Sequence, residues 1–342
     1  MKSVEIRGAN GISRIYTGET LDNITKYTDG RKLVIIADEN VIRYYGRIFP
    51  SCPVFPVSQG EDSKRIENAT RIYEELLGAE IDRSWFILGI GGGVTTDLTG
   101  YVASTYMRGL PFGFIATTLL GQVDAAIGGK NGVNLTGYKN IVGLIRQPEF
   151  VICDINMLKT LNRREFVMGW AEVIKYAAIK DKNFFFFLEE NIEKGLSHDE
   201  DVLNEVIYQS VKTKAEIVEA DEFEIGDRKL LNFGHTFAHG FEKLYKIPHG
   251  EAVSAGMALA SKLSVNVGLL KQEDSDNLIH LLKRTGLPVH IDFDPEELSL
   301  AMLKDKKRAG GTIQLILLEE MGKAVVKSFP LINLKDLLYD LH

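Results

Sequence analysis

Three of the seven histidines in the chain lie close together, at His235, His239 and His249. His235 and His239 are four residues apart, which puts both imidazoles on one face of a helix at a spacing typical of a metal-binding pair. His249 follows a proline, so we expect it in a loop before the next helix. A single histidine is more often an ordinary hydrogen-bonded side chain, but three so close together favour a functional site. Spacing alone would assign His235 and His239 to a metal ion.

A glutamate elsewhere in the chain is a candidate third ligand. Glu172 and Lys175 are three residues apart on one face of an otherwise apolar helical pattern. In isolation they would be an ion pair on a helix surface. If two histidines converge on Glu172, the set becomes one oxygen and two imidazoles, which is a familiar ligand set for a zinc ion with open coordination positions.

The first half of the chain contains a different candidate, the glycine run at 91–93 directly after the apolar segment 85–90. Glycines let a backbone approach a phosphate closely, and the amides at the start of a following helix face the anion. The spacing is not GxGxxG. A tight strand-to-helix turn is the alternative, and we favour phosphate binding. Asp38 ends the apolar run 32–38, where it would accept from a ribose hydroxyl or cap a helix.

A second polar stretch runs from residue 116 to 134. It holds a threonine pair, Asp124, a glycine pair before Lys130 and two asparagines, and Lys139 and Asn140 follow shortly after. Any one of these residues could belong to a solvated loop. Their concentration in a segment of small side chains favours a binding site for an anionic group.

The elements that must position these residues change character along the chain. Apolar runs at 32–38, 85–90, 112–118 and 150–154 predict strands, and 65–81 predicts a helix between two of them. This alternation is typical of an α/β domain with a largely parallel sheet. Helical periodicity then dominates, at 163–181, 202–221 and 251–270, with a predicted hairpin at 312–318 and 323–329. We therefore predict two domains, 1–157 and 158–342. The phenylalanine run 184–187 is expected to lie in a core or a subunit interface.

The composition of the chain excludes some classes of function. The chain has 342 residues, a net charge of −7 and only two cysteines, Cys52 and Cys153. The length suggests two domains, and the negative charge argues against nucleic acid as a partner. Two distant cysteines provide no disulfide framework. The sequence shows neither a signal peptide pattern nor an apolar run long enough to cross a bilayer, so we expect a cytoplasmic protein with no membrane partner.

Several separate motifs, in one order, resemble the 3-dehydroquinate synthase family. They are GGGVTTDLTGYVASTYMRG, TTLLGQVDAAIGGKNGVN, GYKNIVG, AEVIK, DEFEIGDRKLLNFGHTFAHGFE and HGEAVSAGM. The similarity runs from about residue 33 to residue 311. Because it depends on many motifs at once, it is far more specific than any one of them.

The resemblance implies a Rossmann-like α/β domain that binds NAD, followed by a mainly helical domain that holds a divalent metal, zinc or cobalt. It implies an active site in the cleft between the two domains, and a homodimer. The implied activity belongs to the shikimate pathway and to aromatic amino acid biosynthesis. It converts 3-deoxy-arabino-heptulosonate 7-phosphate, a phosphorylated sugar acid, to 3-dehydroquinate and phosphate, a carbon–oxygen lyase reaction. NAD is reduced and then regenerated within each turnover.

Matching the motifs residue by residue implies roles for particular side chains. The metal ligands fall on Glu172, His235 and His249, which replaces the assignment from spacing and moves His239 to the substrate. The implied substrate-binding residues are Arg108, Asp124, Lys130, Lys139, Asn140, Lys175, Lys214, Arg228, Asn232, His239 and Lys307. Four of these, Lys130, Lys175, Asn232 and His239, are expected to be catalytic. The implied NAD-binding residues are Asp38, Glu61, Lys64, Gly92, Gly93, Asp97, Thr117 and Thr118, together with Lys130 and Lys139.

The sequence departs from the usual family pattern at a few small residues: Thr95, Thr96, Ala116, Ala125, Ala126, Asn131 and Gly240. None of these changes removes a charged residue of the expected site. Another sugar-phosphate cyclase, or a polyol dehydrogenase of the glycerol dehydrogenase type, is the alternative. A non-catalytic NAD-binding or metal-sensing protein would have no use for so many charged groups. The presence of Asn232, His239 and the lysines favours 3-dehydroquinate synthase.

Overall fold

The computed structural model describes residues 1–9, 11–306 and 311–341. Its contacts divide the chain into two compact units. The first unit consists of Met1–Phe166 and Leu203–Phe223, and the second of Val167–Val202 and Glu224–His342. The first unit is thus assembled from two separate pieces of chain. The division of roles between residues 1–157 and 158–342 stays a prediction.

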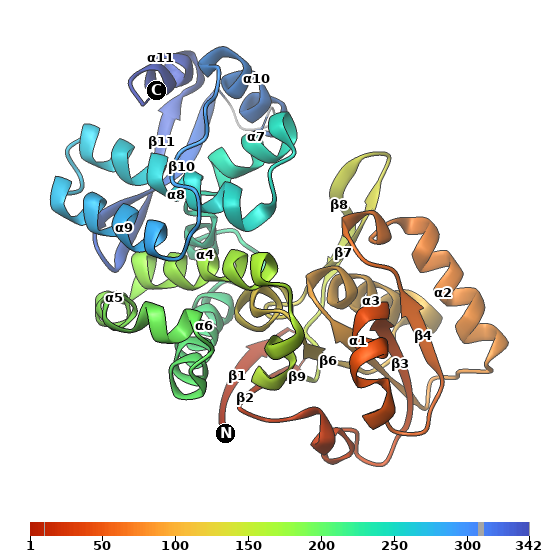
Figure 1. The fold of residues 1–342 in the computed structure, drawn as a ribbon. Helices are drawn as coiled ribbons and strands as arrows, with labels where there is room; N and C mark the ends of the chain where they lie inside the picture. The colour runs from red at the N-terminus through yellow and green to blue at the C-terminus, as the bar shows by residue number, and fades with distance from the viewer. Residues whose placement is uncertain (10, 307–310, 342) are drawn as a thin grey trace. The chain divides into compact units, whose positions relative to one another are not determined.

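A seven-stranded sheet forms the centre of the first unit (Figure 1), in the order β1-β2-β9-β6-β5-β3-β4. Its strands are β1 (Lys2–Gly8), β2 (Gly11–Thr17), β3 (Lys32–Asp38), β4 (Val54–Val57), β5 (Trp85–Gly91), β6 (Phe112–Ala116) and β9 (Phe150–Cys153). All neighbours pair in parallel except β1 and β2, which are antiparallel. Residues 86–91 of β5 are all buried, as expected for a parallel strand covered on both faces. The predicted α/β class is confirmed.

The order of the strands reverses between β3 and β5. After β3 the chain adds β4 on one side, and then returns to add β5 on the other. In open parallel sheets, ligands bind outside the carboxyl ends of the strands at such a reversal. Helix α3 (Gly93–Thr105) starts directly after β5, and Thr117 follows the end of β6. The glycine run and the threonine pair therefore lie at the edge of the sheet where binding is expected.

Helices and short turns cover this sheet, and a second hairpin stands beside it. The remaining elements of the first unit are η1 (Leu21–Tyr27), α1 (Glu39–Tyr45), η2 (Gly46–Ile48), η3 (Glu61–Ser63), α2 (Ile66–Gly78), η4 (Tyr106–Arg108), η5 (Gly121–Ala125), β7 (Lys130–Leu135), β8 (Tyr138–Ile145), η6 (Ile155–Thr160) and most of α6 (Glu200–Ala220). Hairpin β7–β8, yellow in Figure 1, was not predicted. Its sequence lacks the alternation of apolar and polar residues that marks a strand.

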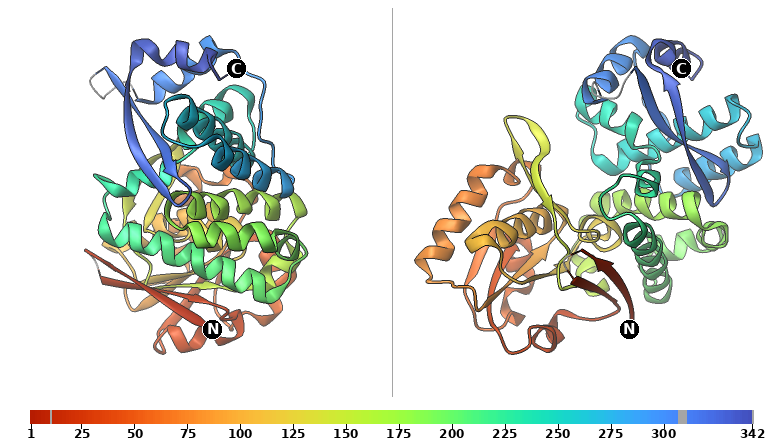
Figure 2. Two further views of the ribbon diagram at one scale, coloured as in Figure 1. Left: turned by 90° about the vertical axis from the view of Figure 1, so that its left-hand side faces the viewer. Right: turned by 180° about the vertical axis from the view of Figure 1, so that it is seen from behind.

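The second unit is mainly helical, as predicted. It contains most of α4 (Arg163–Lys180), α5 (Lys182–Leu196), η7 (Asp227–Asn232), α7 (His235–Tyr245), α8 (His249–Asn266), α9 (Gln272–Arg284), α10 (Pro295–Lys306), β10 (Thr312–Glu320), β11 (Lys323–Pro330), η8 (Leu331–Asn333) and α11 (Leu334–Tyr339). The predicted hairpin is confirmed as β10–β11, and Figure 2 shows it running beside the helices of this unit. The Leu318 amide on β10 donates to the Ser264 hydroxyl of α8 at 3.0 Å. Most residues of α8 are buried, and β10 packs against this helix.

The phenylalanine run belongs to α5. Phe184 and Phe185 are buried, whereas 46% of Phe186 is exposed. Phe184 and Phe185 therefore pack in a core, which is one of the two roles expected for the phenylalanine run. Across the described residues, none of the helices combines the length and the apolar character that a bilayer crossing requires.

Candidate active site

Three potential metal ligands converge in the second unit. Glu172 comes from the middle of α4, and His235 and His249 are the first residues of α7 and α8. Each offers one donor atom, and these atoms all lie within 4.8 Å of one another. The structure thus brings together one carboxylate and two imidazoles from three different helices.

Close contacts at two glycines hold these helices in place. A Cβ atom at Gly256 in α8 would clash with the Gly234 carbonyl oxygen, immediately before His235. A Cβ atom at Gly250 would clash with the Met168 carbonyl oxygen, one turn before Glu172 on α4. Only glycine permits such close contact between helix backbones. The glycines therefore allow α8 to carry His249 up to Glu172 while the start of α7 packs against it.

Both imidazoles are oriented by acceptors on their far side. His235 Nδ1 lies 3.1 Å from the Phe233 carbonyl oxygen, and His249 Nδ1 lies 2.7 Å from Glu242 Oε1. A carbonyl and a carboxylate only accept hydrogen bonds, so each Nδ1 must carry the hydrogen. The two Nε2 atoms then face Glu172 Oε1, at 3.3 Å from His235 and 3.4 Å from His249. This is the arrangement in which histidines bind metals, with the other ring nitrogen fixed by an acceptor.

The electrostatics of this cluster favour a cation at its centre. Glu172 is fully buried, so no solvent screens its charge. Its charge is balanced instead by an ion pair with buried Lys175. Two neutral imidazoles would direct lone pairs at the same carboxylate oxygen, which is unfavourable unless a proton or a metal ion lies between them.

The pKa shifts in this metal-free cluster follow from the same geometry. Burial raises the pKa of Glu172, but Lys175 and the histidines outweigh it, so the carboxyl stays ionised. Burial lowers the pKa of His235. Burial also disfavours the charge on His249, yet hydrogen bonds to Glu172 and Glu242 raise its pKa to about 10. In the absence of a metal, a proton on His249 thus supplies the missing positive charge.

His239 does not belong to the group of three. It lies one turn after His235 on α7, with its ring centroid 5.9 Å from that of His235, and its side chain is exposed. Nearby, Asn232 Nδ2 donates to Glu224 Oε1 at 2.8 Å, and the guanidinium of Arg228 is buried. Lys307 lies outside the described residues.

In the first unit, the glycine run forms a bare helix start. Gly92 is the N-cap residue of α3, and as a glycine it has no side chain with which to cap the first amides of this helix. A Cβ atom at Gly92 would lie 2.9 Å from Thr118 Cγ2, and one at Gly93 would lie 2.9 Å from Ala125 Cβ. Space, rather than a left-handed backbone, therefore requires these glycines. Uncapped amides at the start of a helix are a site for an anion.

Charged side chains form pairs on and beside this helix. Lys64 is buried and forms an ion pair with Asp97, which lies on the second turn of α3. Burial raises the pKa of Asp97, and Lys64 opposes the shift. Glu61 Oε1 accepts from Asn134 Nδ2 at 2.7 Å, and Asn134 Oδ1 accepts from the Asn140 amide at 2.8 Å. Asn134 thus ties the segment of Glu61 and Lys64 to hairpin β7–β8.

A second ion pair joins η5 to α6. Lys214 is buried on α6, and its ammonium pairs with the Asp124 carboxylate and donates to the Asp124 carbonyl at 2.8 Å. Lys130 and Lys139 lie on β7 and β8 with exposed side chains. The structure thus pairs four of the charged residues predicted in this unit, Lys64 with Asp97 and Lys214 with Asp124.

Two further residues predicted to bind ligands in this unit are Asp38 and Arg108. Asp38 caps α1, with its side chain accepting from the Asn40 amide at 2.8 Å, which was the alternative for this position. Arg108 is exposed in a turn where Met107 and Arg108 both have a positive φ. This turn follows the far end of α3, about 20 Å along the helix axis from Gly93. Arg108 is therefore not brought to the glycine run within its own unit.

Sequence reasoning missed two positioning residues, Glu242 and Asn134. Glu242 shares a helix face with His235 and His239, at the spacing i, i+4, i+7, and this was a usable signal. Asn134 is one of two asparagines in the polar stretch 116–134, and nothing in the sequence distinguishes it from the other. Its partners, Glu61 and Asn140, could not be inferred because the hairpin itself was not predicted.

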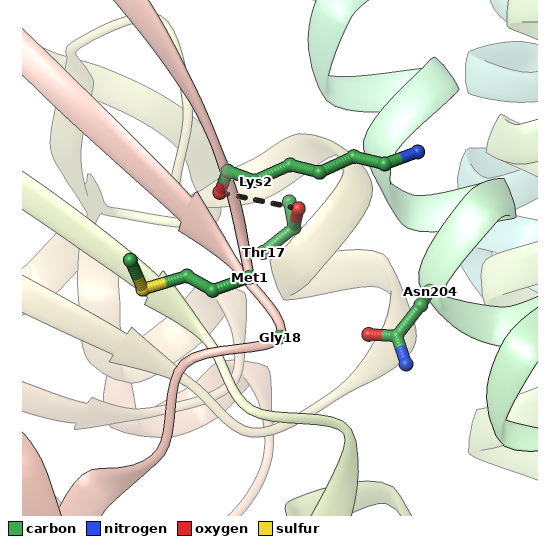
Figure 3. A pocket seen from close by; sticks show the side chains of 5 residues that line it. All are labelled: Met1, Lys2, Thr17, Gly18 and Asn204. Atoms are coloured by element: carbon green, nitrogen blue, oxygen red, sulfur yellow. Dashed lines mark hydrogen bonds between the residues drawn. The ribbon is translucent and has the colours of Figure 1, made fainter.

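A separate small cavity, of about 190 Å³, contains none of these residues. It is lined by Met1, Lys2, Thr17, Gly18 and Asn204. Figure 3 shows the Thr17 hydroxyl bonded to the Lys2 carbonyl, at 3.4 Å, with Asn204 opposite. The cavity lies between α6, which carries Asn204, and strands β1 and β2, which carry Lys2 and Thr17.

Comparison with known proteins identifies the family. The sequence profile of the 3-dehydroquinate synthase N-terminal domain matches residues 54–168, and that of the C-terminal domain matches residues 169–308. The chain is 41% identical over 328 residues to the 3-dehydroquinate synthase of Coxiella burnetii (strain CbuG_Q212), which covers 91% of both chains. The chain belongs to the 3-dehydroquinate synthase family, as its motifs indicated.

Two solved structures show how widely the fold is shared. One is ValA, the 2-epi-5-epi-valiolone synthase of Streptomyces hygroscopicus subsp. jinggangensis 5008 with NAD⁺ and Zn²⁺ bound. It is 27% identical, has a TM-score of 0.87 and covers 96% of both chains. The other is 2-deoxy-scyllo-inosose synthase with carbaglucose-6-phosphate, NAD⁺ and Co²⁺. It is 24% identical, has a TM-score of 0.84 and covers 99% of this chain and 100% of its own, a likeness of fold alone.

Proposed function

We propose that this protein is a 3-dehydroquinate synthase that uses NAD and a divalent metal, zinc or cobalt. The substrate is 3-deoxy-arabino-heptulosonate 7-phosphate, and the products are 3-dehydroquinate and phosphate. The observation that carries the proposal is the convergence of Glu172, His235 and His249 beside Lys175, in a chain of this family. Relatives that share about two fifths of its residues carry the same activity in their names.

Glu172, His235 and His249 fit the proposed metal. The donors are one carboxylate and two imidazoles whose Nε2 atoms are already directed inward. Three protein ligands leave coordination positions open. When bound, the metal supplies Lewis acidity toward substrate oxygens. The residues themselves hold the ion, and Lys175 offsets the charge of Glu172.

NAD fits the carboxyl edge of the sheet in the first unit. The bare start of α3 at Gly92 and Gly93 offers amides to its pyrophosphate, as such helix starts do in this fold class. Asp38, Glu61, Lys64, Asp97, Thr117 and Thr118, with Lys130 and Lys139, are the remaining proposed contacts. The cofactor accepts a hydride and returns it within each turnover, so it acts as a catalyst.

Cationic and hydrogen-bonding side chains suit a substrate that carries both a carboxylate and a phosphate. The proposed substrate residues of the first unit are Arg108, Asp124, Lys130, Lys139, Asn140 and Lys214, and those of the second are Lys175, Arg228, Asn232, His239 and Lys307. The exposed imidazole of His239 is proposed to bind the leaving phosphate and move a proton there. Lys130, Lys175 and Asn232 are proposed to position the reacting groups.

Two other activities remain as alternatives. Another sugar-phosphate cyclase would close a different carbocycle, and the cyclase ValA has the same fold at 27% identity. A polyol dehydrogenase would release NADH. The higher identity to proteins named 3-dehydroquinate synthase, 41% against 27%, favours the first proposal.

The deciding experiment is incubation of the purified protein with the heptulosonate phosphate, NAD and zinc. We expect stoichiometric phosphate release, 3-dehydroquinate as the product and no accumulation of NADH. Chelation should abolish turnover, and added zinc or cobalt should restore it. Accumulating NADH, or a different carbocycle, would contradict the proposal. We also propose a cytoplasmic homodimer, for which sedimentation in solution tests the dimer.

A further inference from the structure

We infer that Glu242 is a positioning residue for the metal site, holding His249 in the one tautomer and orientation that direct its Nε2 atom to the metal. This inference rests on the proposed metal site. Glu242 lies on α7, seven residues after His235, and reaches across the turn between α7 and α8. Glu242 Oε1 lies 2.7 Å from His249 Nδ1, and its side chain is only 10% exposed.

The hydrogen bond between Glu242 and His249 fixes the tautomer of the imidazole as well as its orientation. Because a carboxylate only accepts, His249 must donate through Nδ1, which leaves the Nε2 lone pair for the ion. A nearly buried carboxylate also makes a shorter and stronger hydrogen bond than a neutral acceptor does. It therefore increases the electron density that His249 offers to a cation.

The contrast with His235 sharpens the assignment. His235 Nδ1 donates to the neutral Phe233 carbonyl at 3.1 Å, within its own chain segment. His235 is therefore oriented by the backbone turn that starts α7, and no side-chain change can remove that acceptor. His249 depends on a side chain from a different helix. Its ligation should be the more sensitive of the two to mutation.

Charge supports the same role. Among the described residues in contact with the three ligands are the Glu242 carboxylate and the Lys175 ammonium, beside Glu172 itself. This leaves an excess negative charge that a divalent cation offsets. Removing the charge of Glu242 should weaken the binding of a cation even where a hydrogen-bond acceptor is kept.

The test compares Glu242→Gln and Glu242→Ala with the wild-type protein, and with Glu273→Gln as a matched control. Glu273 is an exposed glutamate on α9, so its replacement removes the same charge away from the site. Zinc affinity is measured by competition with a chelator, independently of turnover. We expect Glu242→Ala to bind zinc about 100-fold more weakly and Glu242→Gln about 10-fold more weakly, the range found for outer partners of metal ligands. The control should match the wild type.

A second readout separates positioning from simple bracing of α7 against α8. In the zinc-loaded wild-type protein, ¹⁵N chemical shifts should show His249 protonated at Nδ1, and Glu242→Ala should lose this pattern. If His249 carries its proton on Nε2, or if both variants bind zinc like the wild type, the role of Glu242 is wrong. If both Glu242 variants unfold at the same lowered temperature without metal but keep the zinc affinity of the wild type, Glu242 only braces the helices. That result would also overturn the positioning role. Failure of the wild type itself to bind zinc would refute the metal site as well.

Discussion

His235 and His239 lie one turn apart on α7 with ring centroids 5.9 Å apart, yet the structure gives them different surroundings. We predict that His235→Ala loses the metal, whereas His239→Ala keeps the metal and loses turnover. Structural zinc sites with four ligands bind with about 10–16 kcal/mol, or about 3 kcal/mol for each ligand. Loss of His235 should therefore weaken zinc affinity about 100-fold. Loss of His239 should leave the affinity unchanged and lower kcat by about 10²–10⁴, the usual contribution of a positioned proton-transfer group.

The assay is zinc content after dialysis, beside the turnover number, for each purified variant. Burial lowers the pKa of His235, so the residue is neutral in the metal-free protein and its loss removes no charge. The metal-free His235→Ala protein should therefore stay folded, which circular dichroism can check. A metal-free His239→Ala protein, or a fully active one, would refute the division of labour between these two histidines.

Three further predictions concern packing, protons and the first unit. Gly256→Ala adds a methyl group against a backbone oxygen that cannot move aside. The substitution should therefore lower the free energy of unfolding by about 1–3 kcal/mol and weaken zinc binding. The control Gly78→Ala, which has open space around it, should change neither quantity. The pKa of His249 is raised to about 10, so zinc that binds at pH 8 should displace about one proton from the protein. The apparent affinity for zinc should therefore rise about tenfold per pH unit up to about pH 10. A pH indicator that records no proton release on zinc binding would contradict this prediction. Lys64→Met leaves the partly buried Asp97 carboxylate without its ion pair, so NAD affinity measured by calorimetry should fall, and unchanged affinity would exclude a role for this pair.

Much of the framework was readable in the sequence. The strands at 32–38 and 85–90 were found because parallel strands buried on both faces appear as continuous apolar runs. The helical second half and hairpin β10–β11 followed from periodicity. Hairpin β7–β8 was missed because β8 is mostly exposed, so no apolar alternation marks it.

The candidate site was readable only in part. Spacing paired His235 with His239 because both lie on one helix, and nothing local indicates that His249 is the closer partner. That proximity depends on α4, α7 and α8 approaching through Gly250 and Gly256, a long-range contact that periodicity does not contain. The motifs of the family carried the missing information. The partners of Lys64 and Lys214 likewise come from distant segments, and the fold alone joins them.

Because residues 203–223 belong to the first unit, a single cut in the chain cannot divide this protein into two complete domains. A fragment ending at residue 166 would contain the sheet and Asp124 but would lack Lys214, which pairs with that carboxylate. The complementary fragment would carry all of α6 without the sheet of the unit to which most of this helix belongs. A split at the apparent midpoint of the sequence would thus leave two incomplete halves. Gene dissection, domain exchange between relatives and split-protein reporters would all need to keep α6 with the N-terminal sheet.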